Sequence, residues 1–160
     1  MKVLLWIYLL QINTPAVQTF DMSKIRSLYR NAAKIKQDAL ELNSMMLQVH
    51  SSAIPLLICY KGANEMIQAK YALNPFRKFD KFNKGKKLIK IAFSLDTLNL
   101  EMRFIRYSIQ SNLPAFLNYN DELDADKRFL VNNTKNNKDP ELREIIYNYL
   151  TTQPGTNRKN

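Results

Sequence analysis

The chain has 160 residues, of which 46% are hydrophobic and 24% charged, and it carries a formal net charge of +10 at pH 7. This length suits one domain with a single hydrophobic core, and the composition excludes a disordered chain. Three glycines are too few for a sheet with many tight turns, and one cysteine excludes an intrachain disulfide. The positive charge favours anionic partners, namely nucleic acid, anionic lipid or acidic protein.

The first sixteen residues, 1–16, are predicted to be a signal peptide. A charged start, Met1-Lys2, precedes an apolar run over 3–10, and the small residues Thr14-Pro15-Ala16 suit a cleavage site. The run has about half of the ~20 residues that a helix needs to cross a bilayer, so no transmembrane helix is predicted. The expected location is exported, either periplasmic or associated with the outer membrane. The alternative is a native N-terminal element of a cytoplasmic protein.

A single helical domain is predicted over residues 21–150. Its clearest periodic signal is a row of apolar residues spaced by three and four. They are Ile25, Leu28, Ala32, Ile35, Ala39, Leu42, Met46 and Val49. This spacing predicts one continuous amphipathic helix, with Asp21 or Ser23 as its N-cap.

Two further helices are expected next. One begins near Pro55 and ends before Asn74-Pro75, because proline suits a first turn and the residue before proline disfavours helix. Gly62 in its middle lowers helix propensity, which predicts a close contact with another helix there. The following helix is predicted over 81–94 and ends at the polar segment 96–99.

The last part of the domain holds three more predicted helices. The fourth runs over 100–111. A fifth opens at 120–122 with several acidic residues, which the positive end of a helix dipole explains. After a polar loop over 132–138, Asp139-Pro140 supplies the N-cap and first residue of a sixth helix, and 151–160 is expected to be a flexible tail. The predicted fold is therefore all-α, with about six helices in antiparallel hairpins, stacked as a bundle or a short solenoid.

The stretch from Phe82 to Arg106 resembles one degenerate tetratricopeptide-type unit. Gly85, Ile89 and Ala92 stand at the small-large-small positions of that repeat, and 96–99 stands at its turn. Thr97 replaces the proline of the pattern, and no second copy follows. The resemblance implies stacking of helical hairpins and does not imply a peptide-binding groove.

Several segments also resemble a group of small exported proteins from Bacteroidota that have no assigned activity. The segments are 60–63, 74–76, 83–86, 99–103 and 113–119. The resemblance covers most of residues 23–131, implies an exported helical protein, and brings no activity, cofactor or site residue with it.

No catalytic, cofactor-binding or metal-binding residue is predicted. His50 is the only histidine and Cys59 the only cysteine. A zinc site needs more ligands of these types than the chain has, and no motif supports a Cys–His dyad. Cys59 lies in an apolar stretch and is interpreted as a small core residue.

A candidate partner or anion surface is predicted around Arg103 and Arg106, with Tyr60 and Tyr107. The two arginines share one face of the fourth predicted helix, where they could clamp a carboxylate or phosphate of a partner. The alternative is that they pair with acids on a neighbouring helix. Glu101 lies well round the helix from Arg103 and would pair with a different neighbour.

A second candidate surface is the basic tract over 77–90. Its cations are Arg77, Lys78, Lys81, Lys84, Lys86, Lys87 and Lys90. Phe76, Phe79 and Phe82 are interleaved at a spacing of three. In one interpretation the cations hold phosphates while the rings stack on bases or enter a membrane interface. In the other, which helical spacing favours, the rings form a one-sided core stripe and the lysines are its solvated back.

These patterns together predict a non-enzymatic protein-interaction or scaffold module of the bacterial cell envelope, with no cofactor and another protein as its partner. The alternative is a binder of polyanions, either nucleic acid or an anionic membrane surface, that uses the basic tract 77–90.

Overall fold

The computed structural model describes residues 19–152, and within this range the chain is helical and contains no strand. The α-helices are α1 (Met22–Ala32), α2 (Lys36–Leu47), α3 (Pro55–Tyr71), α4 (Pro75–Leu95), α5 (Leu100–Asn112), α6 (Leu123–Asn133) and α7 (Pro140–Thr152). Two short 3₁₀-helices, η1 (Ala115–Leu117) and η2 (Thr134–Asn136), follow α5 and α6. The predicted all-α class is confirmed. The predicted signal peptide, 1–16, lies outside the described residues.

The single helix predicted over 25–49 is wrong, because the chain breaks it into α1 and α2. No proline or glycine marks the break. The carbonyl groups freed at the end of α1 accept hydrogen bonds from α3: the Tyr71 hydroxyl donates to Ala32 O at 2.7 Å, and Lys70 Nζ donates to Ala33 O. These contacts replace the helical hydrogen bonds that the break removes. The predicted apolar row is buried except at Ile35, which lies in the break and is exposed.

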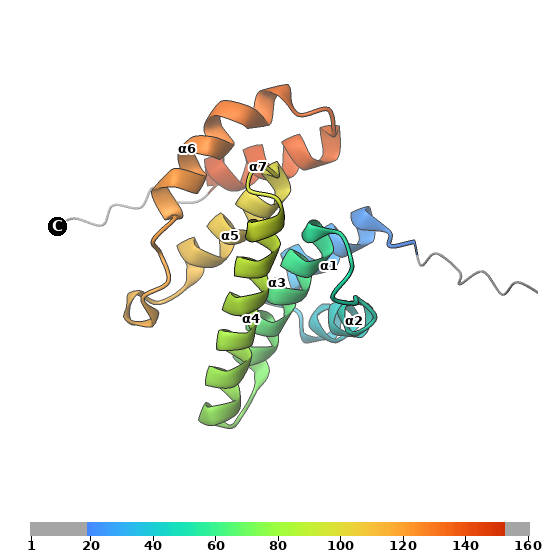
Figure 1. Ribbon diagram of the computed structural model, residues 1–160, viewed down its shortest axis with the longest axis vertical. Helices are drawn as coiled ribbons and strands as arrows, with labels where there is room; N and C mark the ends of the chain where they lie inside the picture. Colours follow the sequence, from blue (N-terminus) through green and yellow to red (C-terminus); the bar gives the residue numbers. More distant parts are fainter. Residues whose placement is uncertain (1–18, 153–160) are drawn as a thin grey trace, which may run out of the picture.

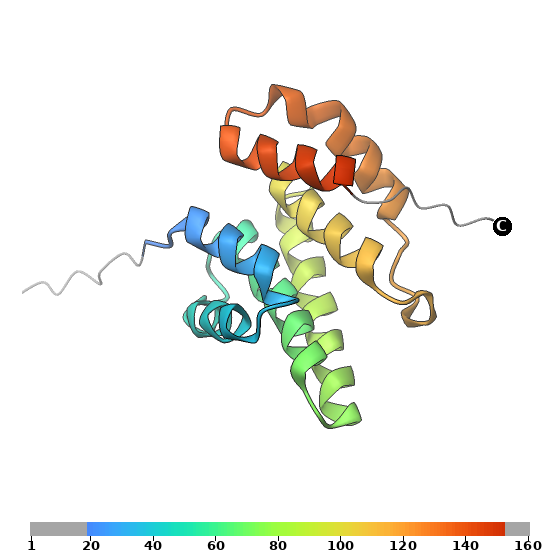
Figure 2. The same cartoon turned by 180° about the vertical axis from the view of Figure 1, so that it is seen from behind.

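Helices α3 and α4 form an antiparallel hairpin that projects from the rest of the molecule, opposite α6 and α7 (Figures 1 and 2). The close contact predicted at Gly62 is present, and its partner is Gly85. A Cβ atom on Gly62 would lie 2.9 Å from Gly85 O and 2.9 Å from Ile89 Cγ1. Because both residues lack a side chain, the two backbones approach more closely than any larger residue allows.

Helix α4 begins at Pro75, six residues before the predicted start at Lys81. Asn74 caps it, since its side-chain oxygen accepts from the backbone N–H groups of Phe76 and Arg77. Proline at the first helical position fits because its missing N–H is not needed there. The whole basic tract therefore lies on one helix.

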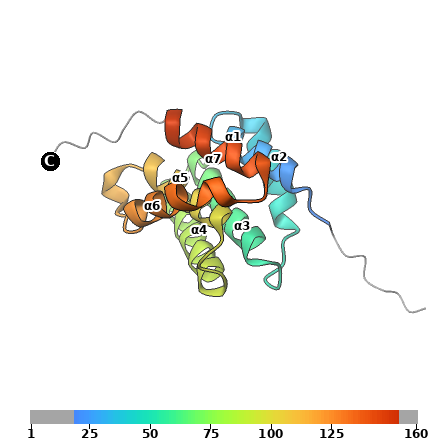
Figure 3. The ribbon, with the colours of Figure 1, turned by 90° about the horizontal axis from the view of Figure 1, so that it is seen from above.

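Two apolar clusters meet at α5. The larger cluster joins buried residues of α1 to α4 with Met102 and Ile105 of α5. The smaller cluster packs the other side of α5, including Phe104 and Tyr107, against α6 and α7. Seen from above, α7 crosses over α1 (Figure 3). Helix α5 thus lies between the two parts of the core.

The C-terminal region is more helical than predicted. The segment predicted as a loop over 132–138 begins with the last residues of α6 and continues through η2. Asp139 caps α7 as expected, because its carboxylate accepts from Leu142 N at 3.1 Å. Thr151 and Thr152 belong to α7 and not to a tail, and residues 153–160 lie outside the described range.

We predict that Gly62→Ala destabilises the protein. Alanine is the better helix former by about 1 kcal/mol, but its methyl group would overlap the α4 backbone, and overpacking of this kind costs about 1–3 kcal/mol. Asn83→Ala, on the exposed side of α4, is the matched control and should leave the free energy of unfolding nearly unchanged. Urea unfolding measures both variants. Equal stability of Gly62→Ala and the control would contradict the close approach.

Candidate functional site

Arg103 and Arg106 point from α5 to a single acidic residue on α6, Asp126. Arg103 Nη1 lies 2.8 Å from Asp126 Oδ1, and Arg106 contacts both carboxylate oxygens at 2.6 and 2.8 Å. Asp126 has 0% of its surface exposed, so its charge depends entirely on these partners. The guanidinium of Arg106 also stacks over the Phe93 ring, 3.8 Å from its centroid.

This geometry corresponds to the alternative in which the two arginines pair with an acid of a neighbouring helix. Tyr60 and Tyr107, the other members of the candidate partner surface, are buried. The four side chains therefore hold the fold together and do not form an accessible face in the described structure.

Asp126 is the residue that sequence reasoning missed. Its position near the start of α6 suggested an ordinary interaction with the helix dipole. The signal that would have found it is its spacing, because Leu123, Asp126 and Leu130 follow one another at intervals of three and four. An acid on an apolar stripe requires a buried cationic partner.

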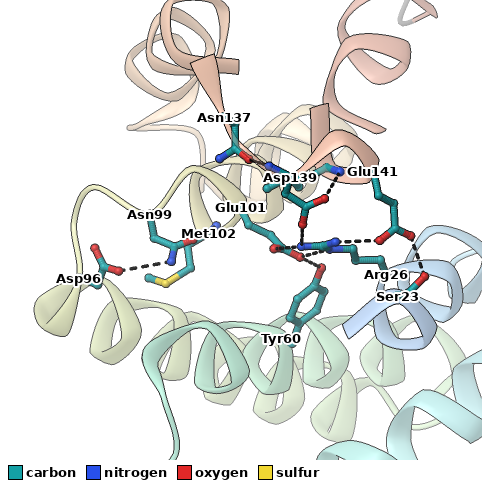
Figure 4. Close-up of polar contacts among 11 residues, drawn as sticks. Ser23, Arg26, Tyr60, Asp96, Asn99, Glu101, Met102, Asn137, Asp139 and Glu141 are labelled. Atoms are coloured by element: carbon teal, nitrogen blue, oxygen red, sulfur yellow. Dashed lines mark hydrogen bonds and ion pairs between the residues drawn. The ribbon is translucent and has the colours of Figure 1, made fainter. Parts of the chain in front are cut away.

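A second ionic cluster joins α1, α3, α5 and the start of α7 (Figure 4). Arg26 Nε and Nη2 contact the two carboxylate oxygens of Glu101 at 2.8 and 2.7 Å. Nη1 of Arg26 reaches Glu141 Oε2 at 2.8 Å, and its Nη2 reaches Asp139 Oδ2 at 2.8 Å. The hydroxyl of Tyr60 donates to Glu101 Oε1 at 2.6 Å. Glu101 thus pairs with a different helix from Arg103, as predicted.

The chemistry of this second cluster is that of a structural ion pair. Burial raises the pKa of Tyr60, and the neighbouring Glu101 charge raises it further, so the hydroxyl stays protonated and donates. The hydrogen bond to Glu101 raises the pKa of Arg26, which keeps its charge. Because Glu101 accepts from both neighbours, its oxygens are occupied and are not placed to act as a base.

The basic tract of α4 divides into paired and unpaired cations. Lys81 and Lys84 both contact Glu65 of α3, at 3.2 and 2.6 Å. Lys86 lies over the rings of Phe82 and Tyr119, 5.8 and 4.9 Å from their centroids. The side chains of the remaining cations make no ion pair or hydrogen bond with any part of the chain that the structure describes; they are Arg77, Lys78, Lys87 and Lys90.

The expected core stripe of three phenylalanines is wrong at two of its positions. Phe82 is buried, but Phe76 is 82% exposed and Phe79 is 64% exposed. Leu73, in the turn before α4, is 97% exposed. Helical spacing places these rings near one another as predicted, but at this end α4 extends beyond the elements that could cover them (Figure 1). We call Leu73, Phe76, Arg77, Lys78 and Phe79 the hairpin tip.

Comparison with known proteins adds no family to this description. No protein-family model matches the chain, and neither a curated protein nor a solved structure was found to be similar to it. Between residues 19 and 152, none of the helices combines the length and the apolar character that crossing a membrane requires. Within the same range, no three His, Cys, Asp or Glu side chains are grouped so as to hold a metal ion.

We predict that Asp126→Ala destabilises the protein by about 3–5 kcal/mol, because it leaves two arginines partly buried without their carboxylate. Asp124→Asn is the matched control, since Asp124 is exposed on the same helix and should change stability by less than about 0.5 kcal/mol. Chemical unfolding followed by circular dichroism measures both. A small effect of Asp126→Ala would show that α6 does not depend on this pair.

We also predict that the Arg26 cluster makes stability depend on acid. Hydrogen bonds from the backbone of Leu142 and from Arg26 lower the pKa of Asp139, and hydrogen bonds from Arg26 and Ser23 lower the pKa of Glu141. A lowered folded-state pKa stabilises the fold above the unfolded-state pKa, and this contribution disappears as the pH falls through the folded-state pKa.

The double variant Asp139→Asn/Glu141→Gln lacks both carboxylates, so it should lose less stability than the wild type between roughly pH 7 and pH 3, a range that spans the ordinary carboxyl pKa values. The asparagine can still cap α7, so the variant is expected to fold. Urea midpoints at the two pH values measure the difference. Identical pH dependence in both proteins would contradict the role of these two carboxylates.

Proposed function

We propose that this protein is a non-enzymatic binding module of the cell envelope that attaches to an anionic membrane surface through the hairpin tip. The observation that carries the proposal is the composition of that tip. Three large apolar side chains, Leu73, Phe76 and Phe79, are exposed at the end of a projecting hairpin, and the cations Arg77 and Lys78 beside them have no partner in the described chain.

The charges and apolar groups suit the boundary between lipid headgroups and acyl chains. Aromatic side chains are favoured at this depth, and each cation near an anionic surface contributes about 1 kcal/mol. Full burial of one large apolar side chain contributes about 1.5–3 kcal/mol. The protein loses translational and rotational freedom when it binds, and this loss opposes part of the favourable free energy. A few such groups therefore support reversible attachment.

Two features favour a membrane over nucleic acid, the other polyanion considered. Leu73 is aliphatic, so it cannot stack on a base as an aromatic ring does. Lys81 and Lys84 would be needed to continue a phosphate-binding track along α4, but Glu65 already neutralises much of their charge. Of the unpaired cations of α4, Arg77 and Lys78 lie next to the exposed apolar side chains of the tip.

The sequence favours a protein partner that binds the surface around Arg103 and Arg106. In the structure these side chains are engaged inside the fold. The hairpin tip replaces them as the proposed contact surface. Export by the predicted signal peptide, 1–16, is part of the same proposal, since it would deliver the protein to a membrane of the envelope. The absence of catalysis is proposed because the buried acids and arginines already satisfy one another.

We predict that the protein sediments with vesicles of phosphatidylglycerol and phosphatidylcholine and much less with vesicles of phosphatidylcholine alone. Phe76→Ser/Phe79→Ser should weaken binding to the anionic vesicles by about tenfold or more, because it removes the inserted rings. Phe116→Ser is the matched control, since Phe116 is also exposed but lies in η1, away from the tip.

Salt is the second test of the attachment. Binding should weaken as ionic strength rises, because the cations are screened, but the inserted rings should keep part of it. Equal loss of binding in the control, or tighter binding to single-stranded DNA than to anionic vesicles, would contradict attachment through the tip.

A further inference from the structure

The break between α1 and α2 lies beside the end of α3 that leads into the hairpin tip. Tyr71, the last residue of α3, donates its hydroxyl to Ala32 O at 2.7 Å, and Lys70 Nζ donates to Ala33 O. Leu73, the first residue of the tip, follows Tyr71 by two positions. Helix α2, which continues from the break, packs beside α3 (Figure 1). The break and the tip are therefore held near one another, although they are far apart in the sequence.

The residues of the break are exposed and carry charge of one sign. Lys34, Ile35 and Lys36 are all exposed, Ile35 to 48% of its surface. The ammonium groups of Lys34 and Lys36 make no ion pair or hydrogen bond with the described part of the chain. Asp38, the next acid along the chain, stands two positions after Lys36, and residues at that spacing face different sides of a helix. The break thus presents an aliphatic side chain between two cations that the fold has not neutralised.

Break and tip together form a surface of one charge sign. The segments 30–36 and 70–79 contain no Asp or Glu. Their cations are Arg30, Lys34, Lys36, Lys70, Arg77 and Lys78. None of these cations forms an ion pair with a carboxylate of the chain between residues 19 and 152. Such a surface attracts negative charge over about 8–10 Å at moderate ionic strength, so it selects an anionic partner.

A lipid surface fits this arrangement better than an acidic protein does. Exposed apolar side chains stand among the cations, namely Ile35 on the break and Leu73, Phe76 and Phe79 on the tip. Apolar side chains next to lysine and arginine suit the boundary between lipid headgroups and acyl chains. An acidic protein would have to cover these side chains with apolar groups of its own, whereas a bilayer supplies phosphates and acyl chains at one surface.

We propose that the break is a second contact with the anionic membrane surface, an inference that rests on the proposed function. Lys34 and Lys36 would lie among the headgroup phosphates while the tip enters the acyl boundary. Two contacts hold the protein in one orientation, because a rotation about the tip would lift these lysines away from the phosphates. The end of the molecule that carries α6 and α7 lies opposite the tip and would face the water (Figure 2).

Sedimentation with vesicles tests the second contact. Each cation beside an anionic surface strengthens binding about fivefold, so Lys34→Gln/Lys36→Gln should bind vesicles of phosphatidylglycerol and phosphatidylcholine about twentyfold more weakly than the wild type. Lys127→Gln/Lys135→Gln removes the same charge from exposed positions of α6 and η2, so it is the matched control and should bind almost as the wild type does.

The outcomes separate this inference from the proposed function. If Phe76→Ser/Phe79→Ser loses binding but Lys34→Gln/Lys36→Gln binds as its control does, the tip attaches the protein and the second contact is overturned. If the wild type does not sediment with anionic vesicles, the proposed function fails and this inference fails with it.

A fluorescent label tests the position of the break directly. Cys59 is fully buried, so a polarity-sensitive thiol dye should react with an added exposed cysteine. On Ile35→Cys the emission should shift to the blue when anionic vesicles are added, because the label leaves water. On Val131→Cys, an exposed position of α6, it should not shift. Equal emission changes at the two positions, or no change at Ile35→Cys, would overturn the single orientation.

Discussion

Buried charge on α5 determines how the parts of this protein are joined. Glu101 faces Arg26 of α1, and Arg103 and Arg106 face Asp126 of α6. Moving an ion out of water costs several kcal/mol, and removing the partner of a buried ion leaves that cost uncompensated. Neither α1 nor α6 can therefore slide along α5 by a turn without exposing a charge to the core. Apolar clusters pack on both sides of α5, and the ion pairs connect it to α1 and α6 at fixed positions.

Two helix starts could be predicted from local sequence, whereas the break after Ala32 and the role of Asp126 depend on distant residues. Pro55 and Asp139-Pro140 mark helix starts through their own backbone chemistry, and both starts are where the pattern predicted them. The break after Ala32 depends on hydrogen bonds from α3, almost forty residues later in the chain. Asp126 likewise pairs with arginines of the preceding helix. Its neighbours in the sequence suggest only an interaction with the helix dipole, which does not account for its burial.

Helices α4 and α5 use their cations differently, and this difference carries the functional argument. On α5 the arginines are matched by carboxylates within the protein, so little of their charge remains for a partner. On α4 only Lys81 and Lys84 are matched in this way. A cation that a carboxylate of the same chain already pairs has less of its charge left for another molecule. On α4, Arg77, Lys78, Lys87 and Lys90 are not paired in this way, so their attraction to an anionic partner is available.

The hairpin tip and the unpaired lysines Lys87 and Lys90 lie at separate places along α4, so the proposed membrane contact engages only part of its basic tract. Phe76 and Lys90 are about fourteen residues apart, which corresponds to ~21 Å along a helix axis. The contact between Gly62 and Gly85 holds the intervening part of α4 against α3. A membrane that takes up the tip to a depth of about 5–10 Å would not reach Lys87 and Lys90. These two lysines would then remain in water while the protein is attached, and the attraction of α4 to the membrane would come mainly from Arg77 and Lys78.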